Sequence, residues 1–279
     1  ALQRGVFLAL LLSLPVAGLW LLTGPALRAM HQDAQLAGAA HGYVTVQLFS
    51  VAPFLVFVAL RQYLHGRAIM LPSLVVVVVG NLVNFTLDWV LIFGRLGFPA
   101  LGVRGSGIAT GVTRVIMLLL LFGLVRWYGL HHGAWVPWTR DVLDLARLRE
   151  ILGHGIPVGL QLGLEIWAFA TTSLFAGWIG AEALAAHPLV LKLASFSYMV
   201  PLGISIAGAT RVGNLVGAGD PAGARRAAWV AIAMGGGVMT VFGTLFVLLR
   251  FRLPGLFLPA GEDAVLGLAA AIMPVAAAF

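Results

Sequence analysis

The sequence contains no cysteine and little charge. Only 10% of its 279 residues are charged, whereas 61% are hydrophobic, and its mean hydropathy is +1.00. A soluble chain of this length needs a polar shell that so few charges cannot provide, so we expect lipid to cover most of its surface. The absence of cysteine excludes disulfides and thiolate metal sites and leaves the redox compartment undetermined.

Acidic residues are also scarce, and the chain carries a formal net charge of +7. Nucleic-acid binding would require basic residues gathered on one face and interleaved with aromatic or polar groups. Here the basic residues lie mainly between apolar runs. The charge therefore gives no support to nucleic acid as a partner.

Long apolar runs dominate what is present. Runs of about 18 to 25 residues predict membrane-spanning helices near 5–22, 43–60, 70–93, 105–126, 156–179, 183–208 and 226–249, with another beginning at 264. Because these runs are continuous rather than alternating, they predict an all-α, polytopic membrane protein and exclude a barrel. The chain starts at Ala1 without a Met and its last apolar run stops at Phe279, so we expect truncation at both ends and no signal peptide.

The arginines predict the orientation of these spans. One side would carry ten and the other five, which favours the first side as cytoplasmic. The first group is Arg4, Arg61, Arg67, Arg126, Arg140, Arg147, Arg149, Arg211, Arg225 and Arg226, and the second is Arg28, Arg95, Arg104, Arg250 and Arg252.

The longest connection predicts the domain boundary. Residues 127–155 separate the fourth and fifth spans, and within them 141–152 alternate charge with Leu and Ile, as in a short amphipathic helix at the membrane surface. We therefore predict an amino-terminal bundle at 1–130, a cytoplasmic linker at 131–155 and a carboxy-terminal bundle at 156–279. A long loop followed by an apolar run with a proline in its middle occurs around Pro53 and again around Pro274. This weak repeat is consistent with two similar halves, which are common in secondary transporters.

Four ionisable side chains fall inside predicted spans: Asp88, Arg114, Glu165 and Lys192. Such a group costs about 2.5 to 3.5 kcal/mol at the middle of a span even on the lenient insertion scales, and it marks a candidate functional site. Asn81, Asn84 and Asp88 are spaced i, i+3, i+7, which places two amides and a carboxylate on one helical stripe. This stripe could bind Na⁺ or carry a proton, or it could join neighbouring helices through hydrogen bonds.

A second stripe follows the fifth span. Gln161, Glu165 and Thr172 share a helical face, and Trp167 and Phe169 are close in sequence. This pattern predicts a cavity lining in which removal of Glu165 from water favours its protonated form, as a carboxyl that gains and loses a proton or Na⁺ requires.

The interpretation of Glu165 has a structural alternative, a salt bridge to Lys192 or Arg114 that serves only assembly. Lys192 and Ser195 share a face of the sixth span, where the lysine could line a cavity or snorkel to the surface. His187 begins the same span, and a lone histidine there is more often a helix contact than a proton relay.

Enzyme chemistry has little support in the sequence. No Ser-His-Asp or metal-binding helix motif occurs, and the glycine-rich run at 102–107 follows no strand and lacks the ending of a phosphate loop. We therefore expect no enzyme activity and no organic cofactor.

Four stretches, in this order along the chain, resemble those of a known family. They are GNLVNFTLDWVLIFG at 80–94, PALGVRGSGIAT at 99–110, GIPVGLQLGLE at 155–165, and LAAH at 184–187 continued by PLGISIA at 201–207 and RVGNLVGAG at 211–219. In these stretches the chain resembles the multidrug and toxic compound extrusion (MATE) transporters, and in particular their bacterial norfloxacin-exporter-like branch.

The resemblance implies a MATE-like exporter of twelve helices in two bundles related by a pseudo-two-fold, of which this chain resembles helices three to ten. It implies a monomer in the bacterial inner membrane that exports cationic or amphipathic compounds in exchange for H⁺ or Na⁺. Glu165 matches a carboxylate that couples export to the cation and could ligate Na⁺, and Asp88 with Asn84 matches an acidic cluster of the amino-terminal lobe.

The working hypothesis is alternating access between the two bundles, with a substrate held by aromatic and Met surfaces. The predicted substrate cavity therefore consists of Gln161, Trp167, Phe169, Thr172, Lys192, Tyr198 and Met199. Two rivals remain: a flippase for lipid-linked glycans, which would favour a basic cavity around Arg114 and Lys192, and an integral-membrane transferase, whose surface motifs are not found.

Overall fold

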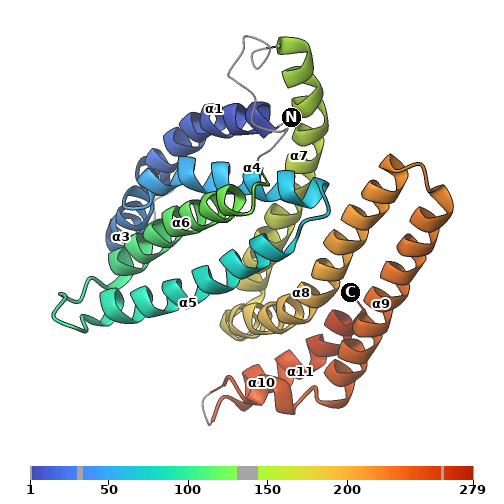
Figure 1. Cartoon of the computed structure of the whole chain (residues 1–279). Coiled ribbons are helices and arrows are strands. Elements are labelled where there is room, and N and C mark those ends of the chain that lie inside the picture. Colours follow the sequence, from blue (N-terminus) through green and yellow to red (C-terminus); the bar gives the residue numbers. More distant parts are fainter. Residues whose placement is uncertain (1, 30–33, 131–143, 259–260, 279) are drawn as a thin grey trace. The chain divides into compact units, whose positions relative to one another are not determined.

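The computed structural model describes residues 2–29, 34–130, 144–258 and 261–278. Every regular element in these ranges is a helix, which confirms the predicted all-α fold class. The chain divides into two compact units, Ala1–Glu150 and Ile151–Phe279, and each is described by itself (Figure 1).

Seven helical stretches of the described residues are long and apolar enough to cross a bilayer. They are Leu2–Ala29, Ala37–Gly66, Leu71–Phe93, Gly102–Trp127, Leu148–Ile179, Glu182–Gly217 and Pro221–Leu248, and a shorter apolar helix covers Asp263–Ala278. Each overlaps one predicted span, because an uninterrupted apolar run has only the helix as a way to satisfy its backbone in lipid. The chain is a multi-pass membrane protein.

Unit 1 contains α1 (Leu2–Leu21), α2 (Thr23–Ala29), α3 (Ala34–Thr45), the 3₁₀ turn η1 (Leu48–Ser50), α4 (Val51–Gly66), α5 (Leu71–Phe93) and α6 (Gly102–Trp127). Its core joins Leu2 of α1, Phe57 and Leu64 of α4, Val76 of α5 and Leu121 of α6, all of which are buried. The predicted span at 43–60 is interrupted, because η1 separates α3 from α4 and the Ser50 hydroxyl donates to the Gln47 carbonyl at 2.7 Å.

Helices α5 and α6 form the closest pair of unit 1, as neighbouring antiparallel helices (Figure 1). Gly94 ends α5 in the left-handed conformation (φ 67°), and the Leu101 amide donates to the Leu91 carbonyl across the turn. Gly105 then lies so near Leu91 that a Cβ would come within 2.6 Å of its carbonyl oxygen. The glycine therefore permits the close approach of the two backbones.

Unit 2 contains most of α7 (Leu145–Ile179), then α8 (Ala181–Gly217), α9 (Pro221–Leu248), the single turn α10 (Arg252–Gly255) and α11 (Asp263–Ala278). Its core gathers Ala186 and Val190 of α8, Phe246 of α9, and Ala269 and Met273 of α11. Helices α8 and α9 lie side by side (Figure 1).

The predicted linker 131–155 is only partly described. Residues 131–143, which include His131, His132 and Arg140, lie outside the described residues. Residues 145–155 form the first turns of α7, so the described part of the expected surface helix at 141–152 continues directly into the span. No proline or glycine interrupts residues 145–152, and helix propagation past them is therefore favourable.

Helix α9 has a well-defined first turn. Asp220 is its N-cap and accepts a hydrogen bond from the Gly223 amide at 2.8 Å, and Pro221 takes the first helical position. We expect Asp220→Ala to lower the free energy of unfolding by about 1 kcal/mol. Thermal unfolding in detergent would measure the loss, and Asp220→Asn, which retains the acceptor, should leave stability nearly unchanged.

Candidate functional site

The candidate site is a cavity of about 550 Å³ within unit 2. It lies between α7, α8, α9 and α11. Helix α7 supplies Glu165, Phe169 and Thr172; α8 supplies His187, Val190, Leu191, Ala194, Ser195, Ser197 and Tyr198; α9 supplies Met239; and α11 supplies Ile272, Val275 and Ala276.

Glu165 carries the only formal charge among these described lining residues. The hydroxyls of Thr172 and Ser197 donate to carbonyls of their own helices, Phe169 O at 2.9 Å and Ala194 O at 2.8 Å. Their oxygens can therefore still accept a hydrogen bond or face a cation. The rest of the wall is mainly apolar or aromatic, so the cavity combines one carboxylate with a mainly apolar lining.

The helical face of α7 explains which predicted residues meet. Glu165 and Thr172 lie two turns apart on the same face and line the cavity with Phe169. Trp167 is only two residues from Glu165, which turns it to the other side of the helix, and its side chain is 70% exposed. Gln161 is exposed and does not line the cavity either.

The face of α8 separates residues that the sequence grouped together. Ser195 and Tyr198 line the cavity with Glu165, whereas Lys192 lines another cavity of unit 2, on the opposite face of α8. Met199 is 67% exposed and lines neither. The expectation that Lys192 and Met199 face the same cavity as Glu165 does not agree with this geometry. At about 100° per residue, each is turned by about 100° from the cavity-lining residue just before it, Leu191 or Tyr198.

His187 is a half-buried polar residue of this region with a buried ring nitrogen. It lines the main cavity and an adjoining one of about 350 Å³, and both cavities also share Thr172 and Ile272. Its Nε2 atom is buried without a hydrogen-bond partner among the described residues. A buried unpaired nitrogen calls for a ligand, a water or a proton partner.

The stripe on α5 belongs to unit 1. Asn81 is exposed, and Asn84 and Asp88 are half-buried. In the described part of the chain, the Oδ1 atom of Asp88 is buried without a hydrogen-bond partner, and so is the Oγ1 atom of Thr113 on α6. An unpaired buried carboxylate oxygen is the feature expected where a proton or small cation is taken up.

Arg114 is held by neutral groups. Its guanidinium donates to Gln47 Oε1 at 3.2 Å and to Ser50 Oγ at 3.4 Å, and it lies 4.7 Å from the centre of the Phe54 ring and 5.9 Å from that of Trp20. The aromatic rings and two acceptors compensate the buried charge. Within the described residues of unit 1, this arginine therefore forms no salt bridge with Asp88.

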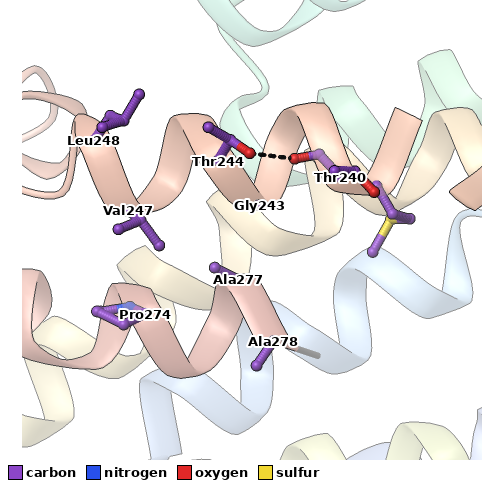
Figure 2. A pocket seen from close by; sticks show the side chains of 9 residues that line it. Thr240, Gly243, Thr244, Val247, Leu248, Pro274, Ala277 and Ala278 are labelled. Atoms are coloured by element: carbon purple, nitrogen blue, oxygen red, sulfur yellow. Dashed lines mark hydrogen bonds between the residues drawn. The ribbon is translucent and has the colours of Figure 1, made fainter. Parts of the chain in front are cut away.

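A further groove of unit 2 lies between α9 and α11. Figure 2 shows Thr240, Gly243 and Thr244 of α9 facing Pro274 and Ala277 of α11, with the Thr244 hydroxyl donating to the Thr240 carbonyl at 2.7 Å. A Cβ on Gly243 would lie 3.0 Å from the Ala277 carbonyl oxygen. Small residues thus set the spacing of this helix pair.

Sequence reasoning missed part of both sites. Met239, Ile272 and Val275 complete the cavity, but an apolar residue in an apolar span carries no signal that would single it out. Gln47 and Ser50, the partners of Arg114, could have been found, because polar residues inside the predicted span 43–60 also require an explanation.

The side chains around Glu165 and Asp88 offer oxygen ligands, which suit H⁺ or Na⁺ better than a transition metal. No group of three or more His, Cys, Asp or Glu side chains gathers anywhere in the described ranges, as a transition metal would require. The available ligands are carboxylate, hydroxyl and carbonyl oxygens, which suit H⁺ or Na⁺. The fold and the cavity together define a multi-pass helical membrane protein with an apolar pocket built around one carboxylate.

Comparison with known proteins identifies the family. The MatE family model matches residues 1–90 and 157–279. The chain belongs to the MatE family, which confirms the resemblance drawn from its four sequence stretches.

Individual relatives are also MATE or NorM proteins by name. The chain is 34% identical over 289 residues to the "Probable multidrug resistance protein NorM" of Mesorhizobium japonicum, covering 99% of this chain and 60% of the relative. The crystal structure of the eukaryotic MATE transporter AtDTX14 matches with a TM-score of 0.85 at 23% identity, over 99% of this chain and 60% of that one. The bent form of the Vibrio cholerae MATE transporter VcmN matches with a TM-score of 0.78 at 18% identity, over 98% and 61%. The chain thus spans about three fifths of these proteins.

Proposed function

We propose that the full-length protein is a secondary transporter of the bacterial inner membrane that exports cationic or amphipathic compounds in antiport with H⁺ or Na⁺. The observation that supports this most is the position of Glu165, the one charged group lining an otherwise mainly apolar cavity of about 550 Å³. The relative from Mesorhizobium japonicum is named a probable multidrug resistance protein, which agrees in substrate class.

The cavity favours an organic cation on physical grounds. Glu165 is exposed within unit 2, so its attraction for a positive group exceeds that in water only where lipid or a bound substrate excludes water from the cavity. Phe169 and Tyr198 add aromatic surface that can stack on a flat or quaternary cation. Because little else in the lining is polar, recognition would depend on charge and apolar area, which suits a transporter of chemically diverse compounds.

Coupling follows from competition at the same carboxylate. H⁺ or Na⁺ neutralises Glu165 and releases a bound cation, and rocking of the protein between its two openings completes alternating access. A one-for-one exchange with a monovalent organic cation moves no net charge and is driven by the concentration gradient of H⁺ or Na⁺ alone. When one more positive charge moves inward than outward, a potential near −150 mV adds about 3.4 kcal/mol, at about 2.3 kcal/mol per 100 mV. This energy supports export against a gradient of roughly a few hundredfold.

The flippase alternative has less support. A lipid pyrophosphate needs a basic cavity, but Arg114 is already bonded to Gln47 and Ser50, and Lys192 lies on the face of α8 away from Glu165. The cavity with Glu165 would repel an anion.

The direct test is efflux from cells that express the full-length protein. We expect a cationic dye to be exported and an anionic dye of similar size to be retained. If neither dye leaves faster than from control cells, and a fluorescent lipid-linked glycan crosses the membrane instead, the flippase function replaces the one proposed.

Asp88 provides a second test. Its unpaired Oδ1 atom supports uptake of the coupling ion, so Asp88→Asn should lower the initial rate of dye efflux by about tenfold or more, since a loss of about 1.4 kcal/mol corresponds to a factor of ten. Asp263→Asn, at an exposed site in the first turn of α11, is the matched control and should transport like the parent. Replacing Na⁺ by K⁺ at fixed pH would separate the two ions: transport that survives is coupled to H⁺.

A further inference from the structure

A second cavity of unit 2, of about 480 Å³, lies on the face of α8 that points away from Glu165. Its wall is built from apolar side chains, including Phe196 of α8, Phe242 and Phe246 of α9, and Phe257 just after α10. One charged group, the Lys192 ammonium, also lines it. We call this cavity the Lys192 groove.

Lys192 is the only lysine in the sequence, against sixteen arginines. Its side chain is exposed and has no hydrogen bond or ion pair among the described residues. No carboxylate lines the groove: Glu165 lies in the cavity on the opposite face of α8, and Glu262 and Asp263 lie at the start of α11 outside the lining. The groove therefore has a net positive charge.

The packing of α8 on α9 sets the depth of this charge. The two helices run antiparallel, and Gly208 of α8 lies against Ala231 of α9. Lys192 lies sixteen residues before Gly208, and Val247 lies sixteen residues after Ala231. In an antiparallel pair this puts Lys192 level with Val247, which is next to the last residue of α9. The ammonium thus lies level with the end of α9, beside Leu245, Phe246 and Leu249.

Two further cations follow at this end of the helix pair. Arg250 and Arg252 come directly after α9 and are exposed, and the Arg250 guanidinium lies 5.0 Å from the centre of the Phe251 ring. Aromatic and basic residues at a helix end are typical of the boundary between lipid tails and headgroups. The Lys192 groove therefore lies near headgroup level, with apolar side chains on both sides of the ammonium: Phe196 and Phe242 along α8 and α9, and Phe257 beyond the end of α9.

We propose that the Lys192 groove binds one anionic phospholipid, with its phosphate on the Lys192 ammonium and an acyl chain along Phe196, Phe242 and Phe246. Charge complementarity selects this occupant. An organic cation would be repelled, and an apolar helix would cover the phenylalanines but leave the ammonium uncompensated. Basic pockets between membrane helices on the cytoplasmic side bind anionic headgroups for this reason. Here the lipid would belong to the other leaflet, since Arg250 and Arg252 are predicted on the opposite side. The site is separate from the proposed transport cavity and does not depend on the transport function.

The first experiment uses the lysine as its own reporter. The full-length protein is reconstituted in vesicles of phosphatidylcholine alone or of equal parts phosphatidylcholine and phosphatidylglycerol, and an amine-reactive reagent is added. We expect phosphatidylglycerol to slow modification of Lys192 about fivefold, the effect of one favourable basic contact, as followed by peptide mapping. Equal rates in the two vesicles would refute the proposal, and so would a lysine that is unreactive in both.

The second experiment compares variants by native mass spectrometry with added phosphatidylglycerol. Lys192→Gln should reduce retention of the lipid about fivefold, and Lys192→Arg should preserve it because the charge remains. Arg211→Gln, an exposed change near the other end of α8, is the control and should bind like the parent. Unchanged binding in Lys192→Gln, or equal loss in Arg211→Gln, would show that the lipid is not held at this groove. Because the readout is lipid binding, it is independent of whether the protein exports dye.

Discussion

Glu165→Gln is expected to reduce efflux of a cationic dye by at least about tenfold in the full-length protein. Glutamine has nearly the same shape, so the packing against Phe169 and Thr172 should persist. It removes, however, the only formal charge among the described lining residues and cannot be protonated or neutralised by Na⁺. A charge pair about 4 Å apart at an effective dielectric constant of about 20 is worth about 4 kcal/mol, and losing a third of that already gives a factor of about ten.

The matched control for this variant is Glu182→Gln. Glu182 is exposed in the first turn of α8 and does not line the cavity, so the same chemical change there should leave efflux near the parental rate. Binding of the dye to purified protein, followed by fluorescence polarisation, would show whether the loss arises at the binding step. Parental transport in Glu165→Gln would exclude the carboxylate as the coupling group.

Gly105→Ala is expected to destabilise unit 1 by about 1 to 3 kcal/mol, the usual cost of inserting atoms into a close contact. The new methyl group would come within 2.6 Å of the Leu91 carbonyl oxygen and 2.7 Å of its carbon. These are backbone atoms that cannot rotate away, so α5 and α6 must separate. The midpoint of thermal unfolding in detergent, with a buried probe on α5 or α6, would measure the effect.

Gly123 is the matched control on the same helix. A Cβ there meets no atom within 4 Å, so Gly123→Ala should be neutral or stabilising by up to about 1 kcal/mol through its higher helix propensity. Equal stability of the Gly105 and Gly123 variants would mean that the α5–α6 contact is looser than described. Because α5 carries Asp88, separation of the two helices should also impair coupling.

The spans could be predicted from the sequence because lipid leaves a continuous apolar run few choices. The break at Leu48–Ser50 had a signal in Pro53, which has no amide hydrogen to donate to the Phe49 carbonyl and so disfavours a continuous helix here; the turn is further stabilised by local contacts such as Ser50 to Gln47. The start of α7 was predicted too late, because charge in residues 145–152 looked like a separate surface element but is compatible with the same helix.

The site was predictable to the level of a helical face. Glu165 and Thr172 line one cavity with Phe169, whereas Gln161, which the spacing placed on the same face, does not. Lys192 and Ser195, three residues apart on α8, fall into different cavities, because α9 and α10 pack on one side of the helix and α7 and α11 meet the other. Periodicity alone gives an angle between residues but not the position of the neighbouring helices.

Pro201 lies inside α8, one turn after Ser197. Proline has no amide hydrogen, so the main-chain oxygen of Ser197 lacks its usual intrahelical donor. Ser197 belongs to the wall that faces Glu165. An acceptor oxygen without its helical donor is thus supplied by the polypeptide itself, and no exchange of the Ser197 side chain would remove it. Substitution of the proline would restore the missing amide and occupy this acceptor.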